Sequence, residues 1–169
     1  EIGGKRGFSS PVVFGDTVFV GSGDRRLYAV DAGSGEHRWK FETDGRVESA
    51  PSVAGGIVFV GSDDGRVYAL DTVSGVERWR FETGGKVRSS AAIVGDVVYF
   101  GSSDGAVYAL DAGSGRQRWR FQTEAAPERT RWQKWMRTRE WSYNGDRDFE
   151  GVVSSPAYRD GALFFGSTD

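Results

Sequence analysis

The hydrophobic positions of this chain occur in short runs that recur about every forty residues. The runs TVFVGS (17–22), IVFVGS (57–62) and VVYFGS (97–102) are apolar at consecutive positions, which predicts strands that are covered on both faces. Glycine, paired with aspartate or a second glycine, precedes each run and permits a tight hairpin turn. The pattern therefore predicts short antiparallel strands joined by tight turns.

Each repeat contains four such strands. In the first copy, a third strand is predicted at LYAVD (27–31) and a fourth at EHRWKFET (36–43), with a glycine-serine-glycine turn between them. Four antiparallel strands, without a helix and buried on both faces, are typical of a β-propeller blade. The sequence thus predicts an all-β fold, a single partial β-propeller over residues 1–169. Its predicted parts are three four-stranded blades at 8–43, 48–83 and 88–123, and the first half of a fourth blade at 152–169.

A spaced motif, Ala-x-Asp-x-x-x-Gly-x-x-x-Trp, occurs once in each complete blade. Its residues are Ala29, Asp31, Gly35 and Trp39, then Ala69, Asp71, Gly75 and Trp79, and finally Ala109, Asp111, Gly115 and Trp119. The aspartate can accept backbone N–H groups in a turn, the glycine can take a positive φ, and the indole offers a large flat surface with one N–H donor. These properties favour a structural role in joining one blade to the next.

The three copies in register resemble the tryptophan-docking motif of the pyrroloquinoline-quinone-like (PQQ-like) repeat, which defines a family of β-propellers. The resemblance covers about 140 of the 169 residues. It implies that each indole packs against the neighbouring blade. It also implies one of three roles: a bacterial outer-membrane assembly lipoprotein, a sensor domain of a receptor kinase, or a quinoprotein dehydrogenase. A location outside the cytoplasm, in the periplasm or at the cell surface, is implied as well.

The residues expected of a quinoprotein dehydrogenase are poorly represented. The resemblance implies a calcium ion held by Glu and Asn, a catalytic Asp and, in many of these enzymes, a vicinal cysteine pair. The chain has no cysteine, and its sole asparagine is Asn144. Its sole histidine, His37, falls at a variable position, and the turn aspartates lack the ligand spacing of a calcium loop. Pairs of serines also recur at equivalent positions of the copies: Ser9 and Ser10, Ser89 and Ser90, and Ser154 and Ser155. Only the first of these copies contains a histidine, so the others lack a partner that could activate a serine.

We therefore predict no catalytic residue, no metal site and no cofactor. The function favoured by the sequence is a non-enzymatic scaffold for protein–protein interaction or ligand sensing, and the alternative is a fragment of a PQQ-dependent dehydrogenase propeller. A net charge of −2 supplies no overall field that would attract nucleic acid or an anionic membrane. No run of about 18 apolar residues is present to span a bilayer.

Residues 124–151 interrupt the repeat. Ala91 and Pro156, at equivalent positions of the third and fourth copies, are 65 residues apart in place of the usual 40. The stretch APERTRWQKWMRTREW (126–141) predicts a short helix, with Pro127 in its first turn. Helical spacing brings tryptophan, methionine and arginine side chains to one face. The candidate partner-binding residues are Arg131, Trp132, Trp135, Met136, Arg139 and Trp141.

Three uses of this insertion remain open at the level of sequence. The aromatic stripe could cap the propeller, bind a protein partner, or contact nucleic acid or an acidic membrane surface. Acidic residues within the same segment argue against nucleic acid. The fourth copy also contains only its first two strands, so the sequence predicts open sheet edges. Either the chain is a piece of a propeller of seven or eight blades, or copies of it self-associate into a ring.

Overall fold

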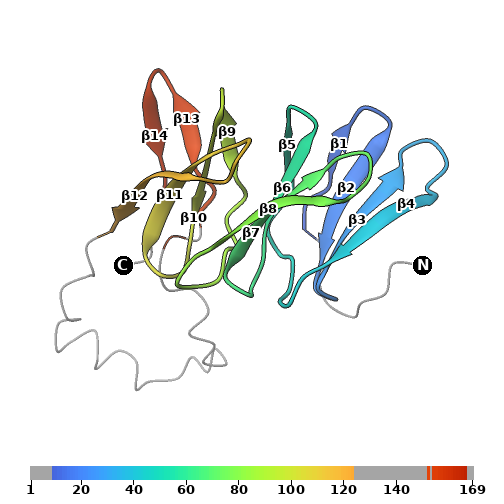
Figure 1. Ribbon diagram of the computed structural model, residues 1–169, viewed down its shortest axis with the longest axis horizontal. Helices are drawn as coiled ribbons and strands as arrows, with labels where there is room; N and C mark the ends of the chain where they lie inside the picture. The colour runs from blue at the N-terminus through green and yellow to red at the C-terminus, as the bar shows by residue number, and fades with distance from the viewer. Residues whose placement is uncertain (1–8, 124–151, 153, 167–169) are drawn as a thin grey trace, which may run out of the picture.

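The computed structural model of the chain describes residues 9–123, 152 and 154–166. Every regular element in these residues is a β-strand, and Figure 1 shows the strands grouped into successive sheets along the chain. The helix predicted at 126–141, together with its candidate partner-binding residues, lies outside the described residues.

The strands form three four-stranded sheets and one two-stranded sheet, each antiparallel and each in sequence order. The first sheet contains β1 (Val12–Phe14), β2 (Thr17–Ser22), β3 (Arg26–Asp31) and β4 (His37–Glu42). The second contains β5 (Ser52–Ala54), β6 (Ile57–Gly61), β7 (Arg66–Asp71) and β8 (Glu77–Glu82). The third contains β9 (Ala92–Val94), β10 (Val97–Gly101), β11 (Ala106–Asp111) and β12 (Gln117–Gln122). The two-stranded sheet contains β13 (Ala157–Arg159) and β14 (Ala162–Phe164).

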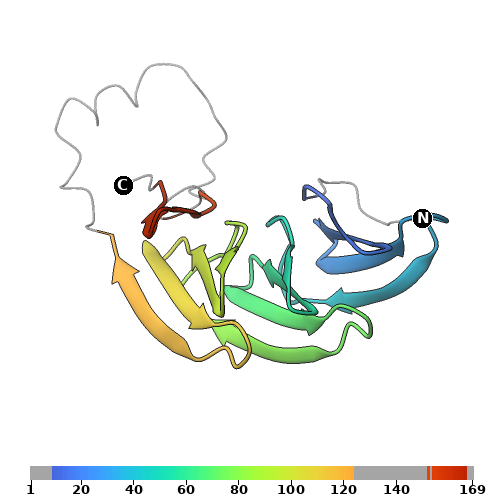
Figure 2. The ribbon, with the colours of Figure 1, turned by 90° about the horizontal axis from the view of Figure 1, so that it is seen from above.

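The sheets stand side by side in an open arc, which Figure 2 shows from above. The first strand of each sheet lies toward the concave side, and β4, β8 and β12 run along the convex side. Antiparallel four-stranded sheets arranged in this way are the blades of a β-propeller. The chain is thus a partial β-propeller with three complete blades and the first two strands of a fourth, which confirms the predicted fold class.

The hydrophobic core lies between neighbouring blades. Phe19 and Leu27 of the first blade cluster with Val58 of the second, whereas Phe59 of the second clusters with Phe100 of the third. Val58 and Phe59 are adjacent on β6 and both are fully buried. Successive side chains of a strand point to opposite faces. The second blade is therefore covered on both sides, which explains why β6 has no polar side chain at any position.

A serine and a glycine join the start of each blade to its second strand. Ser49 Oγ donates a hydrogen bond to the Gly61 carbonyl oxygen at 2.9 Å and accepts one from the Gly61 N–H at 2.8 Å, and Ser89 does the same with Gly101. A Cβ added to Gly61 would lie 2.5 Å from the carbonyl oxygen of Val87. Glycine is required there because the following loop packs directly on the strand.

One turn contains a residue with strained backbone geometry. Arg25, between β2 and β3, has a φ of 72°, whereas the equivalent residues of the other blades, Gly65 and Gly105, have φ values of 86° and 80°. A left-handed conformation costs a residue with a Cβ about 1 kcal/mol, and glycine adopts it freely. The left-handed backbone at Arg25 therefore lowers the stability of the first blade, whereas the glycines of the second and third blades adopt the same conformation without this free-energy cost.

Candidate functional site

Each motif aspartate organises the turn between the third and fourth strands of its blade. Asp31 Oδ1 accepts hydrogen bonds from the backbone N–H groups of Gly33 at 3.0 Å and Ser34 at 2.8 Å, while Oδ2 lies 2.6 Å from Nη2 of Arg38. Arg38, followed by the Ser34 donors, holds the pKa of Asp31 well below its usual range. Gly35 then closes the turn with a φ of 73°. The carboxylate is thus fully engaged in shaping the backbone.

The other two blades repeat this arrangement. Asp71 is 2.7 Å from Nη2 of Arg78, and Asp111 is 2.9 Å from Nη2 of Arg118. The Arg118 guanidinium lowers the pKa of Asp111 to about 2. These ion pairs are partly exposed and are screened by water. They therefore orient the turn rather than form a reactive carboxylate site.

Trp39 and Trp79 each join their own blade to the next one. Nε1 of Trp39 donates a hydrogen bond to the carbonyl oxygen of Thr72 at 3.1 Å, and Nε1 of Trp79 donates to that of Ala112 at 3.0 Å. The indole also covers the motif glycine of the next blade, since a Cβ added to Gly75 would lie 2.6 Å from the Trp39 ring. Each docked tryptophan therefore needs a glycine and a free carbonyl group from the blade that follows.

A phenylalanine two residues after each of these tryptophans adds a second contact. Phe41 meets Tyr68 of the next blade edge-on, with ring centroids 5.3 Å apart, and Phe81 meets Tyr108 in the same way at 5.5 Å. Such edge-to-face pairs stabilise beyond the apolar area that they bury. A complete blade junction thus consists of three contacts between one blade and the next. The tryptophan ring covers the glycine, the indole N–H donates a hydrogen bond to a backbone carbonyl group, and the phenylalanine ring packs against the tyrosine ring.

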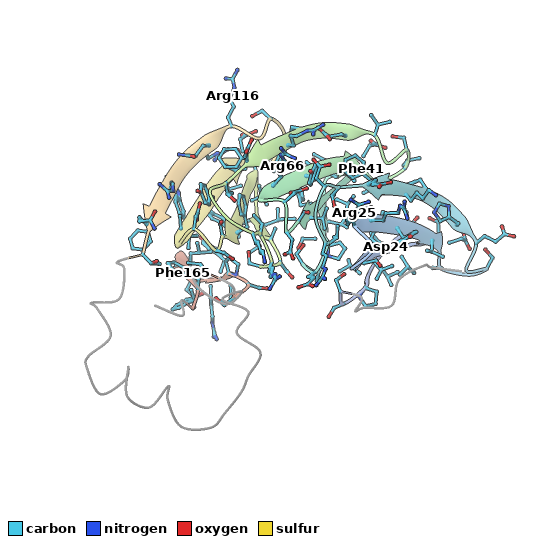
Figure 3. The ribbon with its side chains drawn as sticks, turned by 90° about the horizontal axis from the view of Figure 1, so that it is seen from below. Asp24, Arg25, Phe41, Arg66, Arg116 and Phe165 are labelled. Carbon is cyan, nitrogen blue, oxygen red and sulfur yellow. The ribbon has the colours of Figure 1, made fainter. Side chains whose placement is uncertain are left out.

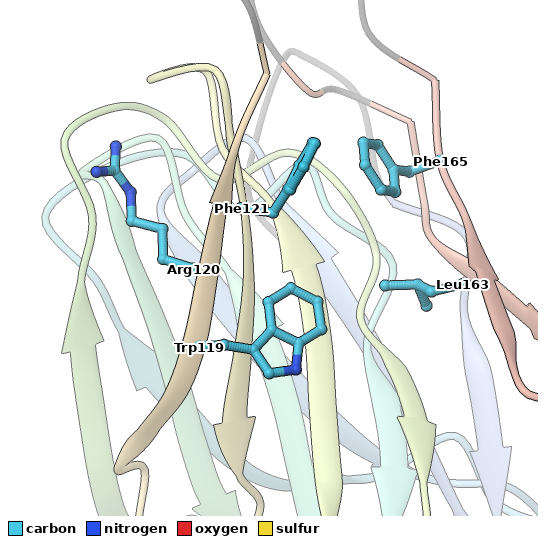
Figure 4. A pocket seen from close by; sticks show the side chains of 5 residues that line it. All are labelled: Trp119, Arg120, Phe121, Leu163 and Phe165. Carbon is cyan, nitrogen blue, oxygen red and sulfur yellow. The ribbon is translucent and has the colours of Figure 1, made fainter.

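The third blade presents the same two aromatic positions without a complete blade beside them. Trp119 is 41% exposed and Phe121 is 53% exposed. The Phe121 ring meets Phe165 with centroids 5.9 Å apart. Trp119, Arg120, Phe121, Leu163 and Phe165 line a groove of about 430 Å³. Figure 4 shows Trp119 and Phe121 on one side of it and Leu163 and Phe165 on the other, and we call it the blade 3 groove.

The first blade presents the opposite half of a junction. Among the described residues, no atom lies within 4 Å of a Cβ added to Gly35, whereas Gly75 and Gly115 are each covered by a tryptophan of the preceding blade. Trp119 and Gly35 therefore mark the two sides of the arc at which the repeated contact is incomplete.

A tyrosine and an aspartate occupy the opposite end of each blade. Tyr68 Oη and Asp64 Oδ2 are 2.7 Å apart, and Tyr108 Oη and Asp104 Oδ2 are 2.6 Å apart. Burial, followed by the hydrogen bond to the aspartate, raises the pKa of both tyrosines to about 12. Figure 3 shows the first-blade counterpart of this end, where Asp24 lies next to Arg25. These hydroxyl groups stay protonated, donate hydrogen bonds to the aspartates and stabilise this end of each blade.

An ion pair that the repeat pattern does not contain ties the third blade to the second. Arg88 Nε is 2.7 Å from Asp63 Oδ1, and Arg88 Nη2 is 2.8 Å from Oδ2. Both side chains are only 12% exposed, and Glu48 lies 3.4 Å from the same guanidinium. The positions of Arg88 and Asp63 carry Glu48 and Ser103 in the neighbouring copies. Sequence reasoning missed this pair because only the fold reveals that the two positions meet.

The candidate enzymatic residues do not assemble into a reactive site in the described part of the chain. His37 is exposed on β4 and its ring meets Tyr28 edge-on at 6.0 Å. Within residues 9–123, 152 and 154–166, no three His, Asp or Glu side chains are placed to hold a metal ion. Asn144, the sole asparagine that could serve the implied calcium–quinone site, lies outside the described residues. No helix among them has the length and hydrophobicity needed to cross a membrane.

Three blades joined by docked tryptophans define a β-propeller built from PQQ-like repeats. The model of one family within this class, described as outer membrane protein assembly factor BamB, matches residues 2–166. The chain belongs to this family. Among curated proteins, none matches the sequence significantly.

Solved structures with the same fold include a BamB protein, alcohol dehydrogenases and computationally designed proteins. BamB from Moraxella catarrhalis is 23% identical with a TM-score of 0.68, over 90% of this chain and 40% of that chain. Quinohemoprotein alcohol dehydrogenase ADHIIG from Pseudomonas putida HK5 is 24% identical with a TM-score of 0.71, over 94% of this chain and 28% of that chain. The computationally designed Ika4 protein is 16% identical with a TM-score of 0.73, over 99% and 89% of the two chains. The chain thus spans less than half the length of either natural protein.

Proposed function

We propose that this chain is part of a non-enzymatic scaffold that holds protein partners outside the cytoplasm. The observation that carries the proposal is the blade 3 groove, where Trp119 and Phe121 are exposed on a rigid scaffold. The description of the family as an outer membrane protein assembly factor supports both the role and the location.

The chemistry of the groove suits a protein surface. Four of its five lining residues are apolar or aromatic, and the fifth, Arg120, stacks over Tyr108 with its guanidinium 5.5 Å from the ring centroid. Exposed aromatic side chains in a preformed hollow are typical centres of binding energy in protein interfaces. The wall that carries Trp119 and Phe121 is held in place by the β11–β12 pairing, and Leu163 on the other wall is held by the β13–β14 pairing, so binding requires little ordering of the scaffold.

Site-specific photo-crosslinking tests this proposal. A photo-reactive amino acid is placed at position 121 of the protein, in the cells that produce it, and at position 116 as the matched control. Arg116 projects from the convex side, away from the groove (Figure 3). We expect discrete adducts with other proteins at position 121 and none at position 116. Equal adducts at both positions, or none at either, would contradict a partner site in the groove.

A segment of a quinoprotein dehydrogenase is the second candidate function. The similarity to the alcohol dehydrogenase from Pseudomonas putida HK5, over 94% of this chain, favours it. Equilibrium dialysis with PQQ and Ca²⁺ distinguishes the two candidates. Retention of one quinone per chain, with a shifted quinone absorbance, would favour the dehydrogenase, and complete loss of the quinone on dialysis is expected for a scaffold.

A further inference from the structure

The turn between the third and fourth strands of the second blade is apolar, whereas the same turn in the neighbouring blades is not. It contains Val73 and Val76, whose side chains are 85% and 63% exposed, and we call residues 72–76 the valine turn. The matching positions carry Gly33 and Glu36 in the first blade and Gly113 and Arg116 in the third. Exposed apolar side chains bordered by polar ones are typical of interaction sites.

The two valines are not needed to form the turn. In each blade the N–H of the motif glycine donates to the carbonyl oxygen of the motif aspartate, at 2.9 Å in the first two blades and 2.8 Å in the third. The aspartate Oδ1 also accepts the N–H of the serine three residues later, at 2.8 or 2.9 Å in every blade. The first and third blades make these bonds with glycine in place of Val73.

The valine turn stands between two complete blades. Figure 1 shows the β3–β4, β7–β8 and β11–β12 turns at the same end of their blades. Figure 2 shows them in a row along the convex side, with the valine turn in the middle. Its backbone is held from the side, because a Cβ added to Gly75 would lie 2.6 Å from the Trp39 ring. The valines are therefore presented on a rigid support.

The two ends of this row carry opposite charges at one position. Glu36 and Arg116 are both exposed, and within the described residues neither side chain has an ion-pair partner. The other charged groups of the two end turns are alike. Each is one arginine between two aspartates: Asp16, Arg38 and Asp31 in the first blade, and Asp96, Arg118 and Asp111 in the third. Positions 36 and 116 alone therefore distinguish the charges of the two end turns.

We propose that the row of turns is a contact surface for a second copy of this chain, related to the first by a two-fold axis through the valine turn. The valines of the two copies pack on one another at the axis. Glu36 of each copy lies opposite Arg116 of the other, so the contact contains two symmetric ion pairs.

The charges select this arrangement of the two copies. A two-fold axis perpendicular to the row pairs the first blade of one copy with the third blade of the other, and all contacts then occur twice. The alternative, with the rows running in the same direction, places Glu36 opposite Glu36 and Arg116 opposite Arg116. Like charges that face each other at an interface are unfavourable, so the antiparallel arrangement is preferred.

This contact is distinct from the partner site of the proposed function. Arg116 projects from the convex side, away from the blade 3 groove (Figure 3), so the groove stays open in the dimer. It is also distinct from association through open sheet edges, because no strand edge takes part in it. A photo-adduct between two copies at position 116 has twice the mass of the chain, which separates it from an adduct with another protein.

Sedimentation velocity of the full chain, from about 10 µM to about 1 mM, measures the dimer and its dissociation constant. Because the contact is limited to three turns, we expect a weak dimer whose fraction rises with concentration across this range. Glu36→Arg and Arg116→Glu should each raise the dissociation constant at least about tenfold, since each turns two attractive pairs into repulsive ones. Val73→Asp should have a similar effect, because it places two carboxylates at the axis.

A mixture of two single variants gives the sharpest test. Glu36→Arg has arginine at both ends of the row, and Arg116→Glu has glutamate at both ends. Each alone should be monomeric, whereas an equimolar mixture should form a heterodimer with affinity close to that of the parent. Lys40→Glu is the matched control, because it changes the net charge as Arg116→Glu does but lies outside the turns, and it should dimerise like the parent.

Three results would overturn the proposal. The first is a parent chain that stays monomeric up to about 1 mM. The second is a dimer that neither charge reversal weakens, since association would then occur through the sheet edges or another face. The third is a mixture of the two variants that does not dimerise, which would exclude the two-fold pairing of Glu36 with Arg116. None of these results bears on adducts at position 121, so the proposed function is tested separately.

Discussion

Replacing Trp79 and Trp119 separately by alanine tests whether the tryptophans stabilise the propeller through the next blade. The two residues occupy equivalent positions of consecutive repeats and differ in what covers them. Trp79 packs beside Phe59 with ring centroids 5.8 Å apart, covers Gly115 and donates to the Ala112 carbonyl group. Trp119 retains a ring contact with Tyr99 at 5.7 Å but is 41% exposed.

The expected losses follow from these contacts. Burial of roughly 120 Å² of the Trp79 ring at about 25 cal/mol per Å² contributes about 3 kcal/mol, and its hydrogen bond contributes about 1 kcal/mol more. Trp79→Ala should therefore lower the free energy of unfolding by about 4 kcal/mol, within the range for buried tryptophans. Trp119→Ala should cost about 1 to 2 kcal/mol, because the glycine and the acceptor are both absent from its described surroundings.

Urea unfolding followed by far-ultraviolet circular dichroism measures both losses, with linear extrapolation to water. Trp79→Phe serves as the matched control, because it keeps an aromatic ring on Gly115 and removes only the N–H donor and part of the area. We expect it to fall between the parent and Trp79→Ala. Equal losses at positions 79 and 119 would refute the reasoning, since stabilisation would then come from within each blade.

Three further predictions concern other parts of the chain. Arg25→Gly should raise the free energy of unfolding by about 1 kcal/mol, because it removes the strain of a φ of 72°, and a loss of stability in urea unfolding would contradict this. The pKa of Asp111 falls from 3.8 to about 2 on folding, so its contribution to stability is present above pH 3.8 and is lost as the pH falls toward 2. Arg118→Gln should weaken that pH dependence in acid unfolding, and an unchanged pH profile would exclude the ion pair as its cause. Deletion of 128–143 should leave the strand signal in circular dichroism intact, and it tests the insertion as a second partner-binding segment beside the groove: loss of partner capture would support that role, whereas undiminished capture would leave the groove as the binding site.

Much of the fold could be predicted because its determinants are local and repeat. The apolar run at 57–62 and the turn glycines near it indicate paired strands without knowledge of any neighbour. The motif around Asp71, Gly75 and Trp79 likewise indicated a turn and a docked ring. The ion pair between Arg88 and Asp63 could not be found in this way, since its partners lie 25 residues apart and do not recur.

The candidate site could be predicted only in part. The incomplete fourth copy indicated open edges, and the sequence placed the partner-binding residues in the insertion at 124–151, which lies outside the described residues. It did not single out Trp119 and Phe121, because they match Trp39 and Phe41 at every position of the motif. Their exposure depends on which strands stand beside them.

The sequence by itself determined the all-β class, the four-strand repeat and the residues of each turn, because hairpin formation depends on neighbouring residues and on alternation along a strand. Tertiary structure alone decided which aromatic rings are covered. Trp79 is covered because the third blade packs on it, whereas Trp119 has no complete blade beside it and is exposed. A tryptophan at the same motif position therefore stabilises the fold in one blade and lines a groove in the next.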